Sequence, residues 1–345
     1  MDGAVSTERG KRSLPVISAT PALAHPLPPR SVRVSVTDRC DFACTYCRPS
    51  RSDGYTTEAR LELASWEAMF QGLKRAGVRR VRLTGGEPLI HPGIVSIVEL
   101  CASLGFDDVS LTTNASQLAR LAAPLKKAGL QRINVSIDTL DEARFRELTR
   151  GGELRPVLAG IDAALEAGLL PVKLNTVVLR GVNDGELERL LLWAWERRMV
   201  PRFLEVMPIA EGAKLARERL VSVAEMKHSL AARLAPGDGE VEPGLGPAEY
   251  LRARHDPSLR AGFISGTSHT FCESCDRLRV SSTGTLRPCL ATDDGVEAAD
   301  EARAGDPAAI EQRIGEAWTK KPDGRAWKGC TEETAAHVSM RAIGG

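Results

Sequence analysis

Six of the eight cysteines in this 345-residue chain fall into two groups whose spacing suits metal binding. The first group is Cys40-x3-Cys44-x2-Cys47, and the second is Cys272-x2-Cys275-x13-Cys289. A structural zinc site closes with four protein ligands, whereas three thiolates leave one iron of a [4Fe–4S] cubane open to a small molecule. Both groups therefore predict iron–sulfur clusters with an open coordination position.

The first cysteine loop directly follows a predicted strand. A zinc knuckle with a remote fourth ligand is the alternative interpretation of its spacing. Tyr46, beside the last ligand, is suited to pack against an adenine ring. The loop resembles the radical S-adenosylmethionine superfamily, whose defining motif is C-x3-C-x2-C. This resemblance implies that Cys40, Cys44 and Cys47 bind a catalytic [4Fe–4S] cluster, that S-adenosylmethionine chelates its open iron, and that one electron then releases a 5′-deoxyadenosyl radical.

Other motifs fit the same cofactor. Thr84-Gly85-Gly86-Glu87-Pro88 ends the second predicted strand, where absent side chains let backbone groups approach a ligand and Glu87 can pair with an ammonium group. The resemblance implies that Gly86 contacts the methionine half of the cofactor. It implies that Ser136 and Met207, which end the fourth and sixth predicted strands, contact the nucleoside half. Read alone, Met207 is more typical of a core residue.

The second cysteine group also admits a zinc ribbon, with Cys330 or a histidine as fourth ligand. However, residues 33 to 345 resemble the MoaA family, the GTP 3′,8-cyclases of molybdenum cofactor biosynthesis. The resemblance implies that Cys272, Cys275 and Cys289 bind a second [4Fe–4S] cluster, whose open iron binds the guanine of GTP. The matching segments are RVSVTDRCDFACTYC, VRLTGGEPL, LTTN, RINVSID, VKLNTVVLRGVND, RFLEVMP, GPAEY, FCESCDRLRVSSTGTLRPCL and the terminal Gly344-Gly345.

Basic residues on the predicted strands suit a triphosphate. Burying about four negative charges requires charged donors of matched geometry, and the guanidinium fork suits phosphate oxygens. Arg277 and Arg279 lie at i and i+2 and point to one side of an extended segment. An isolated arginine would be interpreted as a solvated surface charge. The resemblance implies a catalytic role for Arg202 and GTP contacts from Arg33, Arg82, Thr112, Lys173, Arg277, Leu278 and Arg279. Alternation along the strand does not by itself choose Thr112 over Thr113.

The implied reaction converts GTP to (8S)-3′,8-cyclo-7,8-dihydroguanosine 5′-triphosphate. The resemblance further implies a homodimer, a terminal Gly344-Gly345 that reaches into the active site, and transfer of the product to cyclic pyranopterin monophosphate synthase. Ala115 replaces the family's usual glycine, and His91-Pro92 a common basic pair. The alternative is a radical enzyme with an auxiliary cluster that modifies another nucleotide or a peptide. A zinc-binding module without enzymatic activity is a third possibility.

The elements that must position these residues alternate along the chain. Short β-branched runs predict strands, and longer stretches with apolar residues at helical spacing predict helices between them. Six such units predict an α/β fold, a partial (βα)6 barrel of the TIM type with chemistry at the carboxyl ends of its strands. The predicted strands are 33–37, 80–84, 108–113, 132–137, 172–179 and 202–207, and the helices are 61–76, 93–104, 117–128, 157–167 and 186–197.

The barrel is expected over residues 30–247, after a flexible proline-rich arm over residues 1–29. A smaller α+β region over residues 248–345 would carry the second cluster and the glycine tail. The formal net charge of +1 gives no general attraction to nucleic acid or anionic membranes. With no long apolar segment and no secretory signal, the chain is expected to be cytoplasmic.

Overall fold

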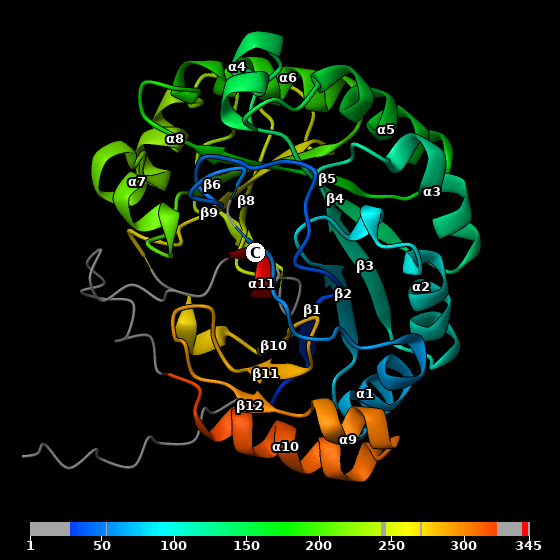
Figure 1. The fold of residues 1–345 in the computed structure, drawn as a ribbon. Coiled ribbons are helices and arrows are strands. Elements are labelled where there is room, and N and C mark those ends of the chain that lie inside the picture. The colour runs from blue at the N-terminus through cyan, green and yellow to red at the C-terminus, as the bar shows by residue number, and fades with distance from the viewer. Residues whose placement is uncertain (1–27, 53, 243–245, 270, 323–339, 344–345) are drawn as a thin grey trace, which may run out of the picture.

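The computed structural model describes residues 28–52, 54–242, 246–269, 271–322 and 340–343. Its core is a curved sheet surrounded by helices (Figure 1). Residues 1–27 of the predicted arm lie outside the described residues. So do Cys330 and the terminal Gly344-Gly345. Among the described residues, no helix is both long and apolar enough to cross a membrane.

Six βα units build the first part of the sheet, as the sequence predicts. Strands β1 to β6 lie side by side in chain order and are all parallel. The strands are β1 (Ser31–Ser35), β2 (Arg80–Thr84), β3 (Asp108–Thr113), β4 (Arg132–Ser136), β5 (Val172–Val178) and β6 (Val200–Glu205). The helices after them are α1 (Leu63–Arg75), α2 (Ile94–Ser103), α3 (Leu118–Lys127), α4 (Glu142–Leu148), α5 (Leu154–Glu166), α6 (Leu187–Glu196), α7 (Glu211–Arg219) and α8 (Val223–Ser229).

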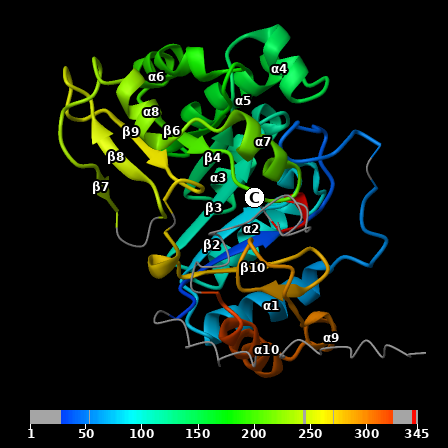
Figure 2. The same cartoon turned by 90° about the vertical axis from the view of Figure 1, so that its left-hand side faces the viewer.

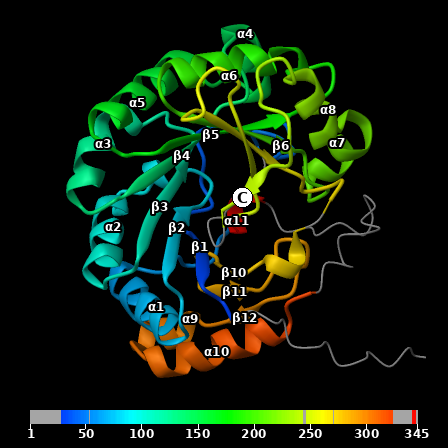
Figure 3. The ribbon, with the colours of Figure 1, turned by 180° about the vertical axis from the view of Figure 1, so that it is seen from behind.

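The C-terminal part of the chain extends this sheet at both edges. Strand β10 is parallel to β1, and β9 is parallel to β6. Figure 2 and Figure 3 show the same fold from two other directions. The 12-stranded sheet thus runs across the predicted boundary at residue 247, which itself stays a prediction. The remaining strands are β7 (Glu240–Val241), β8 (Glu249–Arg252), β9 (Arg260–Ile264), β10 (Arg277–Val280), β11 (Thr285–Arg287) and β12 (Val296–Glu297).

Three helices complete the described chain: α9 (Ala299–Ala304), α10 (Pro307–Thr319) and α11 (Met340–Ile343). The side chain of Asp306 accepts the N–H groups of Ala308 and Ala309, which caps α10. Gly72 of α1 lets α10 approach, because a Cβ there would lie 2.5 Å from Ile310. Helix α11 lies inside the ring of strands (Figure 1 and Figure 3).

Alternation along the strands separates an apolar outer face from a polar interior. Val32 and Val34 of β1 belong to the core between the sheet and the helices, as do Val81 and Leu83 of β2. The intervening residues, such as Arg33, line a cavity inside the ring. The same two-residue period holds in β3 and β4, so the barrel presents a polar wall to its interior.

Candidate active site

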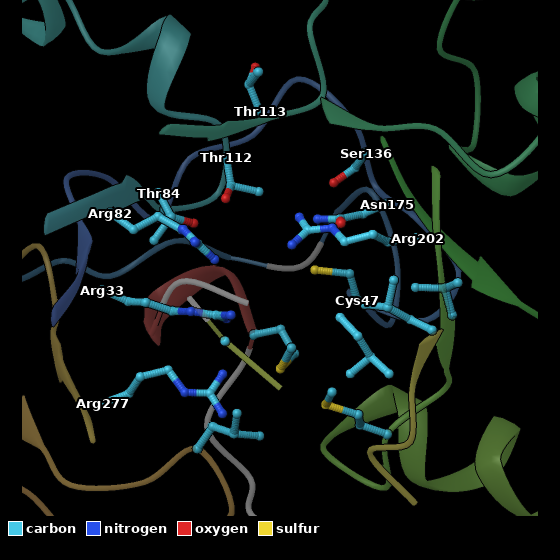
Figure 4. A pocket seen from close by; sticks show the side chains of 18 of the residues that line it. Arg33, Cys47, Arg82, Thr84, Thr112, Thr113, Ser136, Asn175, Arg202 and Arg277 are labelled. Atoms are coloured by element: carbon cyan, nitrogen blue, oxygen red, sulfur yellow. The ribbon is translucent and has the colours of Figure 1, made fainter. Parts of the chain in front are cut away.

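A row of cations crosses the interior of the barrel. In the register of the sheet, Arg33 of β1 stands opposite Arg279 of β10 on one side and Arg82 of β2 on the other. Arg33, Arg82 and Arg277 point into the cavity from one side, and Arg202 points into it from the other (Figure 4). Residues paired across parallel strands share a face, so the sheet itself gathers these charges.

The arginines divide into paired and unpaired groups. Arg80 forms an ion pair with Asp276 at 2.6 Å, and Arg132 pairs with both oxygens of Asp108. Within the described part of the chain, no carboxylate forms an ion pair with Arg33, Arg82, Arg202 or Arg277. The buried Nε atoms of Arg33 and Arg202 also have no hydrogen-bond partner there. Such donors require an acceptor, and an anion in the cavity would supply it.

The unpaired charges oppose one another. Burial, followed by Arg279, Arg277 and Arg82, lowers the pKa of Arg33 well below its usual range. Burial, together with Arg202 and Arg132, lowers the pKa of Arg82 to about 9. Arginine pKa values fall only where positive charge is strongly disfavoured, so the site is electrostatically prepared for a multiply charged anion.

The first cysteine loop is docked onto the end of β2. The N–H of Gly86 donates to the Thr37 carbonyl at 2.7 Å, and the N–H of Glu87 donates to the Arg39 carbonyl at 2.8 Å. A Cβ on Gly86 would lie 2.2 Å from the same Arg39 oxygen. Contact with the cysteine loop therefore explains this glycine independently of any cofactor.

Arg150 holds the opposite side of the same loop. Its guanidinium donates to the carbonyls of Ala43 at 3.2 Å and Arg48 at 2.5 Å, which flank the segment with Cys44 and Cys47. The backbone φ of Arg150 is 53°, a left-handed conformation that is uncommon for residues other than glycine. This conformation ends α4 and aims the side chain at the loop.

Glu87 holds several loops together beside the cavity. The carboxylate, 1% exposed, accepts hydrogen bonds from Thr113 Oγ1 at 2.6 Å and from the N–H groups of Asn114 at 2.6 Å and Leu89 at 2.9 Å. Burial raises its pKa to about 8. Ala115, where the family's usual glycine is missing, has a φ of 63°, which explains why glycine suits the position. Glu87 also lines the cavity, so its pairing with an ammonium group stays a prediction.

The residues expected at the nucleoside half line the same cavity. The hydroxyl of Tyr46 donates to Asp138 at 2.7 Å, and Asp138 also accepts the N–H of Val177 at 2.8 Å. Ser136 stands in register with Asn175, which in turn stands in register with Arg202. Met207 lies against Gly266, where a Cβ would come within 2.7 Å of its methyl group. Tyr46, Ser136 and Met207 therefore all line this cavity.

The second cysteine group borders this cavity. Cys272 and Cys275 lie at the two ends of a tight turn in which the Cys275 N–H donates to the Cys272 carbonyl at 3.1 Å. The cysteines do not line the cavity, but a neighbour of each one does. These neighbours are Phe271, Asp276 and Leu290. Met340 of α11 lines it too, which brings the C-terminal helix to the same place.

Comparison with known proteins assigns both halves of the chain. The family model for the radical SAM superfamily matches residues 34–194, and that for Molybdenum Cofactor Synthesis C matches residues 199–327. The chain is 42% identical over 300 residues to a GTP 3′,8-cyclase of Pseudomonas syringae, with 84% of this chain and 89% of the relative covered. It is 41% identical over 297 residues to a GTP 3′,8-cyclase of Rhizobium etli, with 85% and 84% covered.

The chain belongs to the GTP 3′,8-cyclase family. Among solved structures, Streptococcus suis SuiB bound to S-adenosylmethionine aligns with a TM-score of 0.59 and 18% identity, over 87% of this chain and 68% of that one. SuiB bound to its precursor peptide SuiA aligns with a TM-score of 0.57 and 17% identity, over 87% and 66%. These two structures support the fold, a partial radical SAM barrel with a C-terminal extension.

Membership of the radical SAM superfamily implies a [4Fe–4S] cluster and S-adenosylmethionine, and the donors of this family member fit them. All three thiols of the first group are unbridged and line the cavity. Among the described residues, no three His, Cys, Asp or Glu side chains converge on a single metal ion, whereas the thiolates of a cubane each bind a different iron. Burial, followed by the charges of Glu87 and Asp138 respectively, raises the pKa of Cys40 and of Cys44.

The surroundings of the second group have the opposite charge. Burial acts to raise the pKa of Cys275, but Arg277 and Lys321 outweigh it and bring that pKa to about 6. A thiolate is the form that binds iron, so the lowered pKa of Cys275 suits this donor set to a cluster, whereas Cys40 and Cys44 must lose their protons when they bind iron. The two cysteine groups thus lie in a negative and a positive environment of the same family fold.

The structure brings most of the predicted site residues to one cavity, as the family resemblance implies. Thr112 and Thr113 both line it and point in different directions (Figure 4), so the choice of Thr112 over Thr113 stays a prediction. Three predicted GTP contacts do not line it: Lys173, Leu278 and Arg279. The Leu278 side chain lies in the core, so its contact would have to come from the backbone. The predicted residues that line the cavity are Arg33, Cys40, Cys44, Tyr46, Cys47, Arg82, Gly86, Thr112, Ser136, Arg202, Met207 and Arg277.

Other residues of the site were not predicted. Arg80, Arg132 and Asn175 line the cavity, and each lies at an interior position of its strand. The signal was present in the sequence, since a polar residue at every second position of a strand flanked by helices marks an interior wall. Asp138 follows β4 and is recognisable only through its bond to Tyr46.

Proposed function

We propose that this protein is a GTP 3′,8-cyclase that converts GTP to 3′,8-cyclo-7,8-dihydroguanosine 5′-triphosphate in molybdenum cofactor biosynthesis. One observation carries the proposal: unpaired arginines from β1, β2, β6 and β10 converge on the cavity lined by the first cysteine group. Four cations would oppose the charge of a triphosphate, and guanidinium forks match its oxygens. The relatives' names supply the identity of the nucleotide.

Residues at different positions in the cavity have different roles in the proposed reaction. Arg33, Arg82 and Arg277 bind the triphosphate, while the ion pair of Arg80 with Asp276 forms part of the wall beside them. A [4Fe–4S] cluster on Cys40, Cys44 and Cys47, with S-adenosylmethionine, supplies a 5′-deoxyadenosyl radical when bound. Ser136, Tyr46 and Met207 hold the nucleoside half of S-adenosylmethionine, and the wall of the partial barrel shields the reacting carbon from water.

The second cysteine group would hold a second [4Fe–4S] cluster near the guanine. The cavity-lining neighbours Phe271 and Leu290 support this position, and Arg277 beside Cys275 links the group to the triphosphate site. Transfer of the product to cyclic pyranopterin monophosphate synthase and a homodimer remain proposals from the family, and a cytoplasmic location remains a proposal from the sequence.

Anaerobic turnover tests the proposal. Enzyme reconstituted with iron and sulfide, S-adenosylmethionine, dithionite and GTP deuterated at C3′ should yield deuterated 5′-deoxyadenosine and a cyclised nucleotide. About eight irons and eight sulfides per chain are expected if both groups form cubanes. Release of unlabelled 5′-deoxyadenosine without consumption of GTP would contradict the substrate. Equal conversion of ATP, or of a peptide, would favour the alternative radical enzyme.

GTP binding is expected to be coupled to proton uptake at Lys173. Burial, with Arg202 and Arg132, lowers the pKa of this lysine to about 7, and its Nζ contacts Tyr250 Oη at 3.3 Å. A polyanion near Arg202 favours the protonated form, so its pKa rises on binding. Affinity should therefore weaken as pH increases from 7 toward 10, and binding at pH 8 should take up a fraction of a proton.

Calorimetry at pH 8 in two buffers of different ionisation enthalpy measures this uptake. Lys173→Met should remove most of the dependence of the binding enthalpy on the buffer. Lys227→Met is the matched control, because Lys227 pairs with Glu249 at 2.6 Å on the outer side of the sheet and does not line the cavity. A buffer dependence that persists in Lys173→Met would assign the proton to another group.

A further inference from the structure

Lys321 is a buried cation beside the second cysteine group. It follows α10 and is only 5% exposed, although lysines are rarely buried without a partner. Its ammonium donates to the carbonyls of Pro288 at 2.8 Å and Arg277 at 2.9 Å, and contacts Cys275 Sγ at 3.5 Å. An ammonium group has three N–H donors, so these three acceptors match its full capacity.

The acceptors belong to the two segments that carry the cysteines. Pro288 directly precedes Cys289, and Arg277 lies two residues after Cys275. The turn with Cys272 and Cys275 and the loop with Cys289 are thus joined through one side chain that comes from a third segment. Removing that side chain would leave two buried carbonyls without their donor, which is costly in a folded protein.

The charge of Lys321 also needs a counterpart. Among the described residues, no carboxylate forms an ion pair with it, and its remaining close contact is the ring of Trp318, 4.5 Å from Nζ. A buried cation without a compensating anion is strongly disfavoured. The sulfur donors of the cysteine group are the negative groups that its position provides.

We propose that Lys321 is a positioning residue of the second iron–sulfur site, which holds the segments of Cys275 and Cys289 together and raises the reduction potential of the cluster through its contact with Cys275 sulfur. Hydrogen bonds to cluster sulfurs and nearby positive charge both stabilise the reduced, more negative cluster. The inference rests on the proposed function, because it takes the second cysteine group to bind a cubane.

The test uses the full chain with the first cluster removed, as the variant Cys40→Ala/Cys44→Ala/Cys47→Ala, so that only the second cluster is observed. In this background, Lys321→Met, Lys321→Arg and the control Lys320→Met are compared. Lys320 is the adjacent, exposed lysine, and its Nζ donates to the Gly295 carbonyl at 3.4 Å. Iron and sulfide content and an EPR redox titration are measured for each.

Lys321→Met is expected to lower the ratio of reduced to oxidised cluster at a fixed potential about tenfold. This corresponds to a midpoint potential about 59 mV lower for a one-electron couple. Loss of iron in Lys321→Met with retention in Lys321→Arg would equally support the positioning role. An unchanged midpoint in Lys321→Met, or loss of iron in both variants, would overturn the proposal. If the background with Lys321 intact holds no cluster, the second cluster of the proposed function fails as well, a result that is visible before any lysine is changed.

Discussion

Replacing Arg33 with methionine is expected to weaken GTP binding severely while making the ligand-free protein more stable. Arg33 is the central guanidinium of the row with Arg279 and Arg82, and its Nε has no partner among the described residues. Burial, followed by the charges of its arginine neighbours, disfavours its positive charge and lowers its pKa. Methionine fills a similar volume without a charge, so the free energy of unfolding should rise by about 1 to 3 kcal/mol.

The same change removes a charge-assisted contact from a desolvated site. Losing such a contact costs about 2 to 5 kcal/mol, so the Kd for GTP should rise on the order of 100-fold. Calorimetry with GTP and thermal unfolding without it give the two quantities. Both should be unchanged in Arg79→Met, because the Arg79 side chain is 69% exposed and lies 3.7 Å from Asp107. A variant that binds GTP normally, or that loses stability, would contradict a triphosphate site at this row.

The opposite signs of these effects separate function from folding. Replacing a residue that served only the fold would lower the free energy of unfolding of the protein, and replacing a surface residue would change it little. Proteins are typically destabilised by like charges that a binding site holds close together in position for a ligand. The sign of the change in Arg33→Met therefore tests the electrostatic argument even before GTP is added.

The barrel could be predicted from the sequence because its pattern is local. Strand β2 matches its predicted bounds and β1 begins two residues before its prediction, since β-branched residues at alternate positions specify both. The same alternation predicts which side chains of RVRLT face the interior. It also places Thr112 and Thr113 on opposite faces, but which face is interior depends on the neighbouring strands.

The pairing of β10 with β1 could not be read from the sequence. It joins residues about 245 positions apart, as in the bond from Ser31 Oγ to Asp276, and no local pattern encodes such a contact. Yet this pairing places Arg279 beside Arg33 and brings the second cysteine group to the cavity. The two cysteine groups were recognisable from their spacing, but the position of the second group at the border of the cavity lined by the first followed only from the topology.

Buried polar residues were the hardest to assign, because their partners lie on other elements. Glu87 was recognised as a possible partner for an ammonium group, but its hydrogen bonds from Thr113 and Asn114, on the next strand and its following turn, were not predicted. Lys320 and Lys321 are adjacent residues of the same type, and the sequence does not show that Lys321 is the buried one. A side chain's chemistry is visible in the sequence, whereas its partner is a property of the tertiary structure.

Replacing Gly86 with alanine is expected to prevent assembly of the first cluster. The new Cβ would lie 2.2 Å from the Arg39 carbonyl oxygen and 2.8 Å from that of Asp38, closer than any real contact. The backbone hydrogen bonds from the N–H groups of Gly86 and Glu87 would have to break, and Cys40, next to Arg39, would move with the loop. Because a misplacement of about 1 Å can cost on the order of 100-fold in rate, 5′-deoxyadenosine formation should fall at least that far.

Iron content distinguishes this account from loss of a cofactor contact alone. If Gly86 is needed for the cysteine loop, iron and sulfide should fall to about half in Gly86→Ala, with the second cluster retained. If Gly86 only contacts the methionine half of S-adenosylmethionine, both clusters should persist and only the affinity for that cofactor should weaken. Gly185→Ala is the matched control, since a Cβ there has no atom within 4 Å. Full iron content with normal 5′-deoxyadenosine formation in Gly86→Ala would contradict both accounts, because it would mean that the loop tolerates a displacement which the fold as described does not allow.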